Sequence, residues 1–89
     1  MFKYREDQML DEILKYIEGT YTQHYVAQNN AQLIDIIDDD ELEAFAKISA
    51  MKYIQRFGKK SGRNRKDLLK AAHYIVMMLR IDENKRSVE

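Results

Sequence analysis

Basic side chains gather in one short stretch of this sequence. Lys52 and Arg56 lie four residues apart on an expected helix, and Lys59 and Lys60 follow in a glycine-containing segment before the next helix. Lys and Arg side chains, with N–H groups of loops and helix starts, are the usual partners of phosphate. The stretch therefore predicts a phosphate site, although the P-loop pattern G-x-x-x-x-G-K-[ST] is absent. Two other interpretations stay open: a solvated basic loop that complements a helix C-terminus, and a surface for salt bridges with another subunit.

Arg56 borders an apolar stripe of its helix, where an unpaired guanidinium would be costly. It needs an anion, and the candidates are Asp35, Asp67 and a ligand phosphate. Asp67, Lys70 and Tyr74 share one helix face through their i, i+3, i+7 spacing. That face is interpreted either as surface pairing with a packed tyrosine or as the lining of a nucleotide pocket.

His24 and Tyr25 stand side by side in a segment with neither helical nor strand periodicity. They are expected either to contact a nucleotide or to anchor the loop. The run 38–40 of three aspartates is interpreted as helix-capping, with magnesium ligation as the alternative if a nucleotide binds. Because cysteine is absent and histidine occurs twice, no protein-held metal site is predicted.

The 89 residues suffice for one domain, and 15 basic side chains balance 15 acidic ones. Residues 1–55 hold five cations and eleven acids, for a net charge of −6; residues 56–89 hold ten cations and four acids, for +6. The neutrality is therefore a cancellation between halves, and it does not exclude an anionic ligand. With no apolar run of membrane-spanning length and no signal sequence, we expect a cytoplasmic protein.

Apolar residues recur at helical spacing along most of the chain, which predicts an all-α fold of three to four helices in one domain, 1–89. An N-terminal helix is expected over 1–20, with Gly19 as its stop, and a loop over 20–30. Two longer helices are expected to form a central antiparallel hairpin. The expected helices after the loop are 31–37, 41–57 and 65–81, and the tail 82–89 is expected to fray.

The last of these helices has two apolar faces. One stripe contains Leu68, Ala72, Ile75, Val76 and Leu79. The other is partly polar and contains Asp67, Lys70, Tyr74, Met78 and Ile81. Two such faces on so small a chain indicate either a homo-oligomer or a helix placed between two others.

Several short motifs carry a resemblance to a known family. They are His24-Tyr25, the segment QLIDII at 32–37, KYIQRFGKK at 52–60 and DLLKAAHY at 67–74. The chain resembles, over about 24–81, a small phage-encoded family of unknown function whose members often carry the description "nucleotide kinase". The family's usual Glu-Pro before the Ile-Asp pair is missing here, because the chain has no proline.

The resemblance implies a phage-encoded, nucleotide-binding and kinase-like homo-oligomer without a P-loop, with magnesium accompanying the nucleotide. On this interpretation Lys52, Arg56, Lys59 and Lys60 hold phosphates, and Asp35 or Asp67 orients the basic groups. The alternative is a non-catalytic protein that binds a host protein or sequesters a nucleotide signal. Nucleic-acid binding through 56–66 is disfavoured, because that segment lacks aromatic side chains beyond Phe57.

Overall fold

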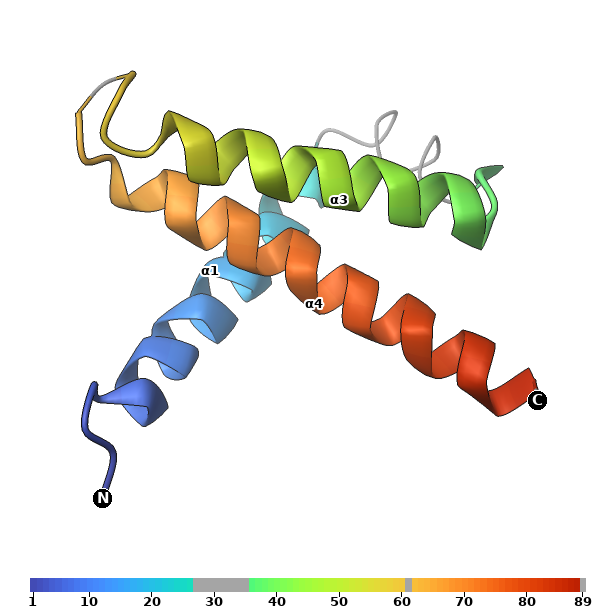
Figure 1. The fold of residues 1–89 in the computed structure, drawn as a ribbon, viewed down its shortest axis with the longest axis horizontal. Coiled ribbons are helices and arrows are strands. Elements are labelled where there is room, and N and C mark those ends of the chain that lie inside the picture. The colour runs from blue at the N-terminus through green and yellow to red at the C-terminus, as the bar shows by residue number, and fades with distance from the viewer. Residues whose placement is uncertain (27–35, 61, 89) are drawn as a thin grey trace. The chain divides into compact units, whose positions relative to one another are not determined.

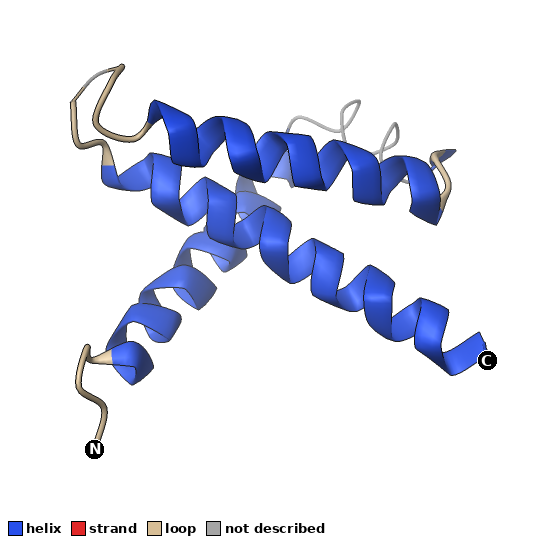
Figure 2. Cartoon of the chain, in the orientation of Figure 1, coloured by secondary structure: helices blue, strands red, loops and turns tan. Residues whose placement is uncertain are grey.

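The computed structural model describes residues 1–26, 36–60 and 62–88, and most of these residues are helical (Figures 1 and 2). The helices are α1 (Glu6–Val26), α3 (Asp39–Arg56) and α4 (Arg65–Val88). The described part contains no strand, so the prediction of an all-α fold is confirmed. It divides into two units, one with α1 and one with α3 and α4.

Helix α1 is longer than the sequence indicated. Gly19 was expected to end it, yet the helix continues to Val26 and takes in much of the segment expected as a loop. A glycine inside a helix costs only about 1 kcal/mol relative to alanine, which is too little by itself to end the helix. The expected short helix at 31–37 lies largely outside the described residues.

Helices α3 and α4 form the expected antiparallel hairpin and lie side by side in Figure 1. A capping box starts α3: the Asp38 carboxylate accepts from the Glu41 N–H at 2.8 Å, and the Glu41 carboxylate accepts from the Asp38 N–H at 3.2 Å. This confirms the capping role predicted for the aspartate run. Asn64 begins α4, because its side-chain oxygen accepts from the Lys66 N–H at 3.1 Å.

Small side chains let the two helices approach each other. Ala46, Ala50 and Ser49 of α3 are buried, as is Ala71 of α4, and Ile81 is the one large apolar side chain of the described residues that is equally buried. A core of this size contributes little hydrophobic stabilisation. Polar and aromatic contacts along the hairpin therefore carry a larger share of its stability.

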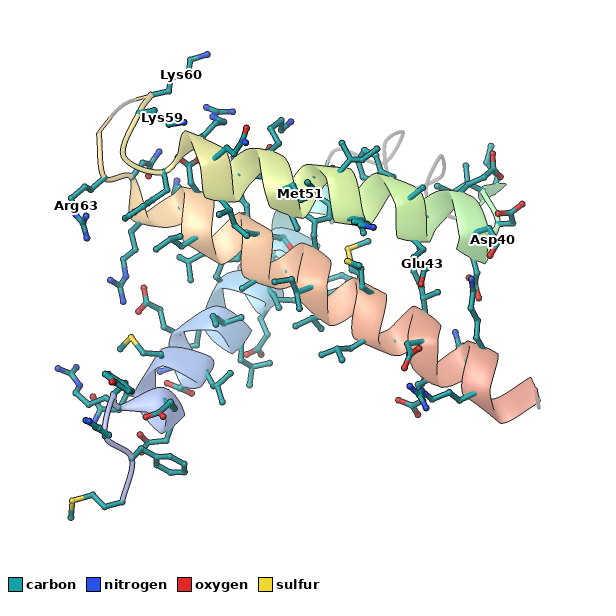
Figure 3. The ribbon with its side chains drawn as sticks, viewed as in Figure 1. Asp40, Glu43, Met51, Lys59, Lys60 and Arg63 are labelled. Atoms are coloured by element: carbon teal, nitrogen blue, oxygen red, sulfur yellow. The ribbon has the colours of Figure 1, made fainter. Side chains whose placement is uncertain are left out.

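The end of α4 is held to the start of α3 by charge. The Lys85 ammonium lies 2.6 Å from an Asp40 carboxylate oxygen and 3.3 Å from one of Glu43, and both acids point toward α4 in Figure 3. The hydrogen bond from Lys85 lowers the pKa of Asp40, and the same bond raises the pKa of Lys85. The tail expected to fray from residue 82 is instead helical to Val88.

The partly polar face of α4 is the one that packs against α3. Asp67 and Ile81 of that face are buried, and Tyr74 contacts aromatic rings of α3. Leu68, Ile75 and Leu79 of the more apolar stripe remain exposed in the described structure. The hairpin thus places Asp67 and Tyr74 of α4 against α3.

Candidate functional site

Three cationic side chains surround the ring of Tyr53 near the loop end of the hairpin. The Lys52 ammonium lies 4.7 Å from the ring centroid, the Lys70 ammonium 5.1 Å, and the Arg56 guanidinium carbon 5.6 Å. Lys52 and Arg56 come from α3 on either side of Tyr53 in sequence, whereas Lys70 reaches across from α4. We call these four residues the Tyr53 cluster. Each cation lies within the distance at which a ring attracts a charge.

Aromatic packing fixes the position of the Tyr53 ring. Tyr74 of α4 stacks on it, with centroids 6.1 Å apart and planes 7° from parallel, and Phe45 meets Tyr74 edge-on at 5.7 Å. Burial raises the pKa of Tyr74, and the neighbouring Tyr53 raises it further, while a hydrogen bond with Ser49 acts in the opposite direction. Tyr74 is therefore a neutral phenol near pH 7, and its role is to hold Tyr53 in place.

Two buried polar atoms at this end of the hairpin have no hydrogen-bond partner among the described residues. They are Nε of Arg56 and Oδ2 of Asp67, whose side chain is only 2% exposed. No ion pair within 4.0 Å neutralises Lys52, Arg56 or Lys70 in the described part of the chain, although other cations there have such partners. Buried polar groups normally find partners, so this end of the hairpin is incompletely satisfied as it stands.

The connecting loop holds the remaining cations at its surface. The N–H groups of Lys59 and Lys60 both donate to the Arg56 carbonyl, at 2.9 and 3.2 Å, which ties the loop to the end of α3. Their side chains are exposed, and Figure 3 shows Lys60 projecting outward from the loop. The Arg63 guanidinium carbon lies 5.0 Å from the Phe57 ring centroid instead. The loop thus adds positive charge beside the Tyr53 cluster without joining it.

Other residues predicted from the sequence fall elsewhere. His24 and Tyr25 belong to the last turn of α1, not to a loop, so the expectation of a loop there is wrong. They lie in the other unit of the chain, and their side chains are not among those described. Asp35 lies outside the described residues. Asp67, Lys70 and Tyr74, predicted as supporting residues, lie on the α4 face that meets α3.

Tyr53 was missed as a candidate, because it was interpreted only as part of the apolar stripe of α3. Part of the signal was present: Arg56 follows Tyr53 by three residues, a spacing at which side chains on a helix are neighbours. Among the described residues, no three acidic or histidine side chains are grouped to hold a metal ion. The site as described can therefore attract and orient an anion through its cations.

The fold and the Tyr53 cluster define a small all-α domain with a cationic site at one end of a helix hairpin. Residues 19–76, about two thirds of the chain, match the model of a family described as a protein of unknown function, DUF3310, and the chain belongs to this family. No curated protein and no solved structure matches the chain. None of the helices in the described residues is both long enough and apolar enough to span a membrane.

Proposed function

We propose that this chain is a nucleotide-binding protein whose Tyr53 cluster holds phosphate groups. One observation carries the proposal: Lys52, Arg56 and Lys70 converge on one ring, and no described carboxylate forms an ion pair with any of them. Like charges held together repel each other, so an entering anion relieves this repulsion as well as forming bonds of its own.

Phosphate suits this arrangement better than a single carboxylate does. It carries up to two negative charges and three acceptor oxygens, enough for all three cations. Arg56 is placed to give the directional contact, because its guanidinium lies beside the Tyr53 ring and donates through a planar, rigid fork. Lys52 and Lys70 would act as charges on flexible stems, one from each helix. Each hydrogen bond to a charged group is worth about 1.5–3 kcal/mol.

Three parts of the proposal rest on the resemblance of the KYIQRFGKK and DLLKAAHY segments to phage proteins described as nucleotide kinases. They are the nucleoside part of the ligand, a kinase-like reaction and phage origin. A magnesium ion would take most of its ligands from the phosphates and water, as magnesium commonly does. Within the described residues, the chain contributes charge and orientation to such a site.

Thermal-shift and calorimetric titrations with nucleoside monophosphates, nucleoside triphosphates and inorganic phosphate test the proposal. We expect Arg56→Met and Lys70→Met each to weaken nucleotide binding by about 10-fold or more, because each removes at least one charge-assisted hydrogen bond. Lys47→Met is the matched control, since Lys47 is an exposed cation of α3 outside the cluster. It should change the affinity by less than about 3-fold.

Two results would contradict the proposal. One is the absence of any shift with nucleotides up to millimolar concentration. The other is an equal loss of affinity in Lys47→Met and Arg56→Met, which would show that only net charge matters. If no nucleotide binds and a host protein co-purifies through the same residues, the alternative of a non-catalytic interaction protein is favoured.

A further inference from the structure

The exposed face of α4 has the spacing of a coiled-coil seam. Leu68, Ala72, Ile75 and Leu79 follow one another at intervals of four, three and four residues. Steps that alternate between four and three residues are those of the heptad repeat, which averages 3.5 residues and presents one narrow stripe to a partner helix. The hairpin does not use the stripe: Leu68 is 42%, Ile75 45% and Leu79 64% exposed, because α3 packs on the opposite, partly polar face.

The seam is bounded by opposite charges. Three residues before Leu68 stands Arg65, and three residues after Leu79 stands Asp82, so both occupy the next positions of the same repeat. All these positions lie within α4, which runs from Arg65 to Val88. The stripe therefore has a basic end, an apolar centre and an acidic end.

We propose that this face binds a second copy of the chain, with the two α4 helices antiparallel about a twofold axis. In that register Leu68 meets Leu79 of the second copy, and Ala72 meets Ile75, so a small side chain lies opposite a large one in the central layers. Arg65 meets Asp82 of the second copy at both ends. A two-fold interface needs such a self-complementary surface.

The charges decide the direction of the pair. In a parallel, in-register pair, Arg65 would face Arg65 of the second copy and Asp82 would face Asp82 of the second copy. Like charges would then repel each other at both ends of the seam. Asp82 already accepts from Arg86 at 2.6 Å, but that pair is exposed, and exposed pairs contribute little. Asp82 can therefore turn to a new arginine at small cost. This proposal is independent of nucleotide binding.

Sedimentation velocity and light scattering of the full chain over a concentration series test the interface. We expect self-association of the natural sequence, and Leu79→Glu should raise the dissociation constant at least about 100-fold, since each dimer loses two buried leucines and gains two buried carboxylates. Ile48→Glu is the matched control: Ile48 is 67% exposed, on α3. It should leave the constant within about 3-fold. Circular dichroism checks that both variants stay helical.

Charge exchange tests the antiparallel register. Arg65→Asp and Asp82→Arg should each weaken the pair by several-fold, and the double variant should restore it, because both end contacts return with their signs reversed. The chain has no cysteine, so introduced ones report on proximity. Mixing the Ala72→Cys and Ile75→Cys proteins under oxidising conditions should give mainly the mixed disulfide.

A monomer at every concentration up to about millimolar would overturn the proposal, whatever else covers the stripe. So would association that survives Leu79→Glu, because the interface would then lie elsewhere. Failure of the folded double charge variant to recover, or crosslinks mainly between identical cysteine variants, would exclude the antiparallel register.

Discussion

Gly58 sets the turn that follows Arg56, and its substitution by alanine gives a clear prediction. Its φ angle is +86°, in the left-handed region that residues with a Cβ rarely adopt. Its N–H donates to the Gly62 carbonyl at 2.8 Å, so the angle is held by the closure of the loop. A Cβ at Gly58 would meet nothing within 4 Å, so the cost of substitution is conformational alone.

The magnitude follows from two opposing terms. The left-handed conformation costs an L-residue about 1–2 kcal/mol. Alanine also restricts the unfolded chain, which returns about 0.4–1 kcal/mol. Gly58→Ala should therefore lower the free energy of unfolding by about 1 kcal/mol, or the Tm by about 4–8 °C in a chain of this size. Asparagine tolerates the left-handed region better than alanine does, so Gly58→Asn should lower the free energy of unfolding less than Gly58→Ala.

Urea and thermal unfolding followed by far-UV circular dichroism measure these differences. Gly19→Ala is the matched control, because Gly19 lies inside α1, has open space at its Cβ position and has no left-handed φ. There alanine should raise helix stability, by up to about 1 kcal/mol. Gly58 does not depend on its left-handed φ if Gly58→Ala is as stable as the natural sequence. The same follows if Gly19→Ala lowers the free energy of unfolding as much as Gly58→Ala does.

Two further predictions concern contacts within the hairpin. Lys85→Met removes the ion pairs with Asp40 and Glu43, so we expect a small decrease in Tm that becomes smaller with added salt. Arg86→Met removes only an ion pair within α4 and should lower the Tm less. Equal decreases in Tm would contradict the cross-helix contact. The pKa of Tyr74 is raised by burial, so above about pH 10 the unfolded state loses the proton first and the free energy of unfolding falls. Tyr74→Phe should flatten this decline, as measured by urea unfolding at a series of pH values. At neutral pH the variant should lose about 1 kcal/mol of unfolding free energy, because the hydrogen bond with Ser49 is gone. An unchanged dependence of the unfolding free energy on pH would contradict this role of Tyr74.

Local signals in the sequence predicted the hairpin well. The aspartate run and Asn64 marked helix starts that the structure confirms within about two residues, because capping depends on side chains close in sequence. The end of α4 could not be predicted in this way. Lys85 contacts acids more than 40 residues away, and no local pattern encodes that pairing.

The same distinction applies to the candidate site. The four-residue spacing of Lys52 and Arg56 predicted that they share a side of α3, and both lie beside Tyr53. That Lys70 joins them depends on which face of α4 meets α3. Counting apolar residues favours the other face as the core. The observed choice follows from small interface residues and the stacking of Tyr74 on Tyr53, which appear only once the helices pair.

Calorimetric titration with nucleotides of the natural sequence, of Arg56→Met and of Lys47→Met is the decisive measurement for phosphate binding by the Tyr53 cluster. We expect saturable nucleotide binding that weakens about 10-fold or more in Arg56→Met and is nearly unchanged in Lys47→Met. Absence of binding to the natural sequence, or equal binding by all three proteins, would contradict it.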